Sequence, residues 1–134
     1  MANKTATFTL NLSYTGPGGT TRTEPAISVL APFQSEVSGE IDIPAGATAG
    51  SSHAIPFGTI AAATGAIVKN GLTQAVVLKA GGATVHVLQA SAFYSMAGAT
   101  AAGATAPLTA LTIEPTTTQA AVGTISYWVF GDPE

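Results

Sequence analysis

The sequence has no cysteine and few charged residues, and both shortages narrow what the chain can be. Without cysteine there can be no disulfide framework, thiolate metal site or cysteine nucleophile, so stability must come from packing. Charged residues make up 8% of the 134 residues, against about 25% in ordinary soluble domains. A chain of this length is expected to form a single domain, 1–134, with a surface made mainly of neutral Thr, Ser, Ala, Gly and Gln side chains.

The scarcity of charge excludes two classes of partner. The chain has four scattered basic residues, which cannot form the phosphate-binding footprint of a nucleic-acid protein. Residues 80–113 carry no charge, but they are mostly Ala, Gly, Thr and Ser and lack the run of about 20 strongly apolar residues that a membrane helix needs. Residues 1–16 lack the apolar core of a signal peptide. We therefore expect neither nucleic acid nor a membrane as a partner.

What the chain has instead is a series of short β-strand patterns separated by turns. Residues 5–14, TATFTLNLSY, alternate large apolar residues with Thr and Asn, which predicts a strand. Glycines and a proline in 16–19 predict a turn after it. Two short strands, 27–30 and 36–43, are expected next, with Pro32 breaking the chain between them.

The middle of the chain predicts a meander of three strands. Its β-rich runs are 66–69, 75–80 and 83–89. Asn70 and Gly71 lie at the first joint, and Gly81 and Gly82 lie at the second. Because these residues tolerate positive φ, both joints are expected to be tight hairpins.

About eight strands and no long amphipathic helix define the expected fold class. The last two strands are expected within 107–115 and 123–130. We predict an all-β protein, an antiparallel β-sandwich that is jelly-roll-like. Two stretches of small, glycine-spaced residues, near 44–52 and 97–106, are expected to be flexible loops because they bury too little surface to offset their ordering entropy.

No group of residues in the sequence indicates catalysis. Asp42, Ser52 and His53 are the residue types of a hydrolase triad, but the serine and histidine are adjacent and no Gly-x-Ser-x-Gly motif is present. The turn at 16–19 lacks the lysine and the following helix of a phosphate loop. We therefore predict a protein that is not an enzyme, with no catalytic residue and no cofactor.

Metal binding has one weak candidate. Glu36, Glu40 and Asp42 have even spacing and would share a strand face, where loop carbonyls could complete a calcium site. His53 and His86 supply only two possible imidazole ligands. Acidic residues on a strand also discourage edge-to-edge association, so we interpret the three carboxylates as solvated edge charges and predict no metal site.

The last strand, TISYWVF, has two apolar faces, which raises the question of what covers the second. Alternation puts Ile125, Tyr127 and Val129 on one face and Trp128 and Phe130 on the other. An ordinary antiparallel sheet leaves its second face polar and solvated. The two rings are therefore covered either by another segment of the same chain, such as the glycine-spaced loop, or by a partner.

Three stretches, IDIPAG, IPFGTIAAATGAIVKNGLTQAVVLKAGG and the closing VFGDPE, together resemble small β-rich structural proteins of tailed bacteriophages. The resemblance covers about 41–89 and 124–134 and consists of strand and turn patterns. It implies a virion component assembled in the host cytoplasm, and among such components small jelly rolls are similar to capsid decoration, or cement, proteins. The partners that it implies are the major capsid protein or other virion proteins, together with copies of the chain itself in a homo-oligomer.

Two other functions stay open. No residue separates a capsid role from a tail, baseplate or neck component of the virion. A carbohydrate-binding module has the same sandwich architecture and would use Trp128, Tyr94 and Tyr127 as sugar platforms. For the assembly function, the expected interface residues are Trp128, Phe130, Tyr94 and Phe93.

Overall fold

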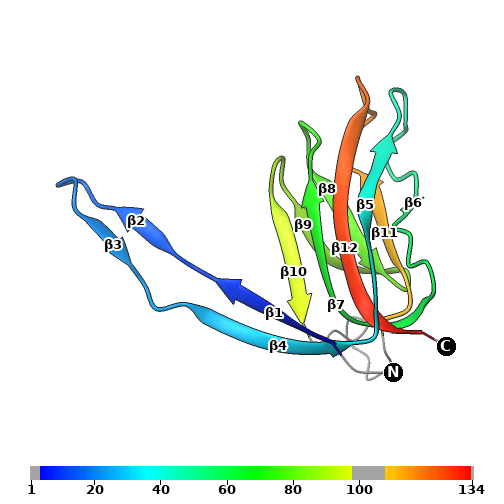
Figure 1. The fold of residues 1–134 in the computed structure, drawn as a ribbon. Coiled ribbons are helices and arrows are strands. Elements are labelled where there is room, and N and C mark those ends of the chain that lie inside the picture. The colour runs from blue at the N-terminus through cyan, green and yellow to red at the C-terminus, as the bar shows by residue number, and fades with distance from the viewer. Residues whose placement is uncertain (1–3, 98–107, 134) are drawn as a thin grey trace.

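The chain is built from β-strands over the residues that the structure, a computed structural model, describes: 4–97 and 108–133. Within these ranges there is no helix, so the predicted all-β class is confirmed (Figure 1). In chain order the strands are β1 (Lys4–Leu10), β2 (Ser13–Thr15), β3 (Thr21–Thr23), β4 (Ile27–Phe33), β5 (Ser35–Ile43), β6 (His53–Ala54), β7 (Ile60–Asn70), β8 (Val76–Ala80), β9 (Ala83–Leu88), β10 (Phe93–Ala97), β11 (Leu111–Pro115) and β12 (Gly123–Pro133).

Eight of these strands form two antiparallel sheets, an arrangement consistent with a β-sandwich. The front sheet has the order β10-β7-β12-β5, and the back sheet has the order β6-β11-β8-β9. One hydrophobic core draws on both sheets. Its members include Ile43, Val68, Ile125 and Val129 from the front sheet and Val76, Leu78, Leu111 and Ile113 from the back sheet. The alternating apolar residues of the strands supply this core because every second side chain of a strand points to the same face.

The first 30 described residues form an arm that leaves the sandwich (Figure 1). The arm consists of residues 4–33: β1 pairs with β4, and β2 pairs with β3 nearer the tip. The predicted turn at its tip is present, with Gly19 at a φ of 77° and the Gly16 N–H donating to the Thr20 carbonyl at 3.0 Å. The expected break at Pro32 is wrong, because β4 continues through it. In a two-stranded ribbon each strand has one unpaired edge. A proline can therefore stay in the strand where its missing N–H would point to that edge, because no hydrogen bond between the strands is lost.

The arm joins the sandwich through a single residue, Gln34, which separates β4 from β5. Its backbone N–H donates to the Gly131 carbonyl of β12 at 3.0 Å. Gly131 also lies at a register shift between β12 and β7, where a Cβ would overlap the carbonyl oxygen of Ala62. The base of the arm is therefore tied to β12, one of the two inner strands of the front sheet.

The predicted meander is half wrong. Gly81 and Gly82, with φ values of 59° and 86°, do form the hairpin between β8 and β9. At the first joint, however, β7 lies in the front sheet and β8 in the back sheet, so Asn70 and Gly71 carry the chain across the sandwich. The reason is the Asn70 amide, which is buried and bonds to backbone groups of both the crossing segment and β9 in place of shaping a hairpin turn.

The first of the two expected flexible loops is hydrogen-bonded to the rest of the fold. In residues 44–52, the Gly46 N–H donates to the Gln119 carbonyl at 2.7 Å and the Gly50 N–H donates to the Pro115 carbonyl at 2.9 Å. Of the second loop, near 97–106, residue 97 ends β10 and the others lie outside the described residues. Flexibility of both loops stays a prediction.

Candidate protein interface

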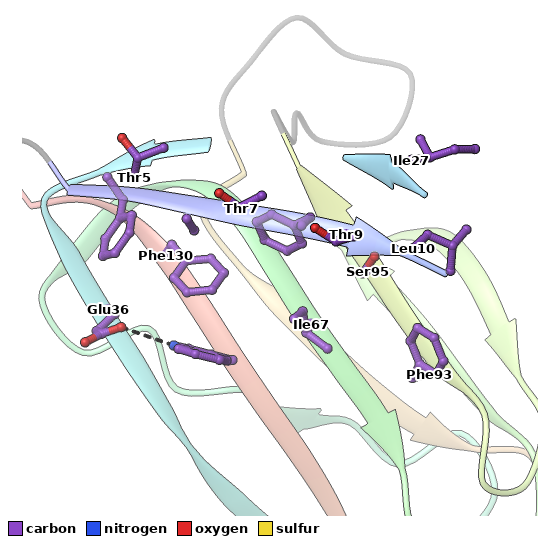
Figure 2. Close-up of a pocket in the computed structure, with 14 residues that line it drawn as sticks. Thr5, Thr7, Thr9, Leu10, Ile27, Glu36, Ile67, Phe93, Ser95 and Phe130 are labelled. Atoms are coloured by element: carbon purple, nitrogen blue, oxygen red, sulfur yellow. Dashed lines mark hydrogen bonds between the residues drawn. The ribbon is translucent and has the colours of Figure 1, made fainter. Parts of the chain in front are cut away.

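A groove of about 630 Å³ lies between the arm and the outer face of the front sheet (Figure 2). We call it the arm groove. Its apolar lining includes Phe8, Leu10 and Ile27 from the arm and Ile67, Phe93 and Trp128 from the sheet. β1 forms one wall, and β7, β10 and β12 form the other.

The strand register explains why apolar residues gather on the sheet side of the groove. Trp128 on β12 lies opposite Ile67 on β7. One row further along the sheet, Lys69 on β7 lies opposite Phe93 on β10. Residues opposite or diagonal to one another on one face are close enough for large side chains to touch. An apolar strip therefore crosses the outer face from β12 to β10, and it is the side that an ordinary sheet leaves polar.

Phe130 lies at the closed end of the arm groove, where the arm covers it. Its ring is only 3% exposed. It meets Phe8 of β1 edge to face, with centroids 5.3 Å apart, and Phe33 of β4 at 5.2 Å. Aromatic pairs at such distances contribute about 0.5–1.5 kcal/mol beyond the area they bury. The cover comes from the arm of the same chain. The glycine-spaced loop, the other expected cover, lies outside the described residues apart from residue 97.

Trp128 lies next to this cluster but stays accessible. Its ring centroid is 5.0 Å from that of Phe130, and the side chain is 44% exposed. The indole Nε1–H donates to the Glu36 carboxylate of β5 at 3.3 Å, the dashed line in Figure 2. This bond orients the ring while leaving much of it uncovered. A Trp with one end wet and one face open is typical of protein interfaces.

The arm beyond its base also exposes apolar surface. Five large apolar side chains of the arm are 46–68% exposed: Leu10, Leu12, Tyr14, Ile27 and Leu30. Leu10 lies opposite Ile27, so these two share the face that lines the groove. Leu30 lies opposite Thr7 and so belongs to the other face of the ribbon. The groove-facing side of the arm and the sheet beneath it form one open apolar surface.

The four residues predicted to form the interface occupy three different environments. Trp128 and Phe93 line the arm groove, and Phe93 is 60% exposed. Phe130 lies at the closed end and is already covered by the arm. Tyr94 packs against the hydrophobic core and stacks on His86 with centroids 5.4 Å apart.

The exposed residues of the arm were not predicted as interface residues. The alternation in 5–14 is a correct strand signal, but a strand pattern does not say whether its apolar face meets the core or leaves it. One sign in the sequence could have indicated exposure. The strands in the middle of the chain already supply enough apolar residues for a core, so the apolar face of 5–14 is additional to it.

The triad residues weighed from the sequence do not form a catalytic group. The Nε2 of His53 lies 3.0 Å from the hydroxyl of Ser51, and not of Ser52. His53 is in the back sheet, whereas Asp42 is on β5 of the front sheet. Across the two described ranges, no three His, Cys, Asp or Glu residues cluster closely enough to hold a metal ion. Over the same residues, the chain forms no helix that could cross a membrane.

Comparisons of the chain with protein-family models, with curated proteins and with solved structures found no match. A functional assignment therefore depends on the arm, the groove and the sequence pattern.

Chelation is expected to leave the melting temperature unchanged. Glu36, Glu40 and Asp42 are exposed residues at alternate or more distant positions of the edge strand β5, and no described carboxylate or imidazole completes a ligand set with them. Thermal melting with EDTA and with excess calcium measures this. A calcium-dependent rise in the melting temperature would contradict it and make these carboxylates ligands.

Proposed function

We propose that this chain is a non-enzymatic structural protein of a tailed-phage virion: a capsid decoration, or cement, protein with a jelly-roll-like sandwich that stabilises the capsid lattice through apolar and neutral contacts. The observation that carries the proposal is the arm. A two-stranded ribbon is marginally stable in water by itself. This one extends beyond its own core and exposes large apolar side chains on both faces, which supports a role in gripping another protein.

The surface chemistry supports the same role. The described residues contain two ion pairs, Arg22 with Glu24 at 3.3 Å and Lys79 with Glu114 at 2.9 Å. Most of the remaining surface is neutral, and neutral groups cost little to desolvate when a second protein covers them. The partners proposed are the major capsid protein or other virion proteins, and further copies of the chain. Association of this kind is expected to persist when the salt concentration is raised.

The alternative functions differ in their support. A tail, baseplate or neck protein would use an apolar arm in the same way, so it stays the second candidate. A carbohydrate-binding module loses two of its three sugar platforms. Tyr94 and Tyr127 pack against the hydrophobic core, and only Trp128 is left open.

The composition of purified particles tests the proposal. Virions of the phage that encodes the chain would be banded on a density gradient, separated into heads and tails, and analysed by intact-protein mass spectrometry for the 13.2 kDa chain. We expect the chain in the head fraction, in many copies per particle. Its presence in tails alone would favour the second candidate. Absence from both fractions would rule out a virion protein.

A further inference from the structure

We propose that the arm groove binds the arm of a second copy of this chain, and that the exchange is reciprocal, so that two copies form a dimer related by a two-fold axis. The inference deepens the proposed function and rests on it for its setting in a particle. The dimer itself is expected to form between two isolated subunits in solution, without a particle. Each copy carries both halves of the contact, an apolar arm and an apolar groove, which is the requirement for a self-complementary interface.

The first argument is the amount of apolar surface left open. On the sheet, Phe93 and Trp128 are 60% and 44% exposed, and on the arm Tyr14 is 46% exposed. With about 200 Å² for a whole aromatic side chain, these three leave about 300 Å² uncovered. The open parts of the aliphatic side chains on the arm add about 200 Å². One copy therefore exposes about 500 Å² of large apolar side chains in this region, as much as the largest patch on a typical monomer.

Reciprocal burial brings this surface to the size of a stable interface. Two copies would cover about 1,000 Å² of apolar side chain. Apolar atoms make up only about 57% of an ordinary interface, so the whole contact would bury about 1,800 Å². Stable protein interfaces bury about 1,200–2,000 Å² in total. An arm laid on the groove in one direction only would bury half of this, below that range.

The second argument is charge. The arm holds Lys4 and Arg22 against Glu24, which gives it a formal charge of +1. The rest of the chain holds two lysines against six acidic residues, a formal charge of −4. At the groove, Glu36 is part of the lining and Glu40 lies further along the edge strand β5, against one base, Lys69, beside Phe93 on the same face, so the acidic residues outnumber the basic one. The arm of one copy is thus attracted to the sandwich of another, and the like-charged sandwiches do not favour direct contact with each other.

Two substitutions test the contact on the intact chain. Leu12→Ser changes the arm and Phe93→Ser changes the groove, and both side chains are more than half exposed, so the fold is expected to keep its melting temperature. Leu30→Ser, on the face of the arm away from the groove-lining Leu10 and Ile27, is the matched control. Light scattering after size exclusion, from about 1 μM to about 1 mM, would follow the mass. We expect wild type and the control to reach twice 13.2 kDa, and each test variant to weaken dimerisation about tenfold or more.

A cross-link identifies which surfaces meet. Because the chain has no cysteine, Leu12→Cys and Phe93→Cys can be prepared separately and mixed under oxidising conditions. We expect a disulfide-linked heterodimer, and none when Val122→Cys, an equally exposed site outside the groove lining, replaces Phe93→Cys.

Three results would overturn the inference: a wild-type chain that stays monomeric up to about 1 mM, dimerisation that Leu30→Ser weakens more than the two test variants do, or a mass of three or more subunits. The particle experiment is independent of all three. A dimer with the expected cross-link that is absent from virions would contradict the proposed function alone. A monomer found in heads would contradict only the exchange, and would assign the arm to a capsid protein.

Discussion

Replacing Phe130 with alanine is expected to lower the free energy of unfolding by about 3–5 kcal/mol. The ring is 3% exposed and contacts Phe8, Phe33 and Trp128, so truncation removes both the buried area and three aromatic pairs and leaves a cavity at the base of the arm. Domains of this size have about 5–15 kcal/mol of stability in all. Urea unfolding followed by tryptophan fluorescence measures the loss, because the Trp128 ring lies beside the substituted site.

Trp128→Ala is the matched control for this result. The Trp128 ring is on the same strand and in the same cluster, but it is 44% exposed and its hydrogen bond to Glu36 is in solvent. We expect a loss of about 1 kcal/mol in folding, together with about 2 kcal/mol or more in binding to a particle or a second subunit. Circular dichroism follows unfolding of this variant, which lacks the fluorophore. A larger folding loss for Trp128→Ala than for Phe130→Ala would mean that the arm does not cover Phe130.

Asn70→Ala is expected to cost about 3–5 kcal/mol of stability, at the end of β7 where the chain crosses from the front sheet to the back sheet. The Asn70 side chain is fully buried. Its amide donates to the carbonyls of Gln74, Leu88 and Gln89 at 2.8–3.2 Å, and its oxygen accepts the Leu72 N–H at 2.9 Å. Alanine leaves several of these backbone groups without a partner, and each buried unsatisfied group costs about 1–3 kcal/mol.

Thr73→Ala, in the same crossing segment but exposed, is the control for Asn70→Ala and is expected to change stability by less than about 0.5 kcal/mol. Hydrogen exchange adds a spatial test. The amides of the 71–75 crossing and of the end of β9 should lose protection in Asn70→Ala before those of β12. Uniform loss over all strands with no change in stability would show that the amide network does not hold the crossing in place.

The sequence predicts the strands well where local chemistry determines them. The alternation of Val37, Ile41 and Ile43 with polar residues predicts 36–43, and the structure has Ser35–Ile43. Gly81 and Gly82 mark the β8–β9 hairpin because both need positive φ. The two faces of β12 are also predictable, because alternation alone separates Ile125 and Val129 from the opposite face.

Pairing between distant strands is what the sequence does not reveal. Asn70–Gly71 has the composition of a hairpin turn, but its role depends on the carbonyls of Leu88, at the end of β9, and of Gln89, just after it, which are 18 and 19 residues away along the chain. The arm is missed for a related reason. Thr-Leu alternation describes a strand with one apolar face. Only the three-dimensional arrangement shows that this face meets Phe130 of β12 at the base of the arm and that its side chains are exposed further out.

For the candidate interface, the sequence identifies Trp128 and Phe93 as aromatic anchors, and the structure places both in one groove. Their role in binding stays a prediction. Leu12 and Tyr14 are exposed residues of the arm that the sequence could not single out, since their exposure follows from the direction in which the arm leaves the sandwich.

The single-residue junction at Gln34 has a consequence for how copies are oriented. An appendage on a flexible linker can hold a neighbour at any angle, so gripping it restricts the position of the neighbour but not its rotation. Here β4 passes into β5 with one residue between them, and the N–H of that residue donates to the Gly131 carbonyl of β12, an inner strand of the front sheet. A partner that holds the arm therefore also holds the rotation of the whole sandwich. Once the arm is bound, each sandwich therefore has little rotational freedom left. The entropy lost when many copies adopt the single orientation that a regular shell requires is correspondingly small.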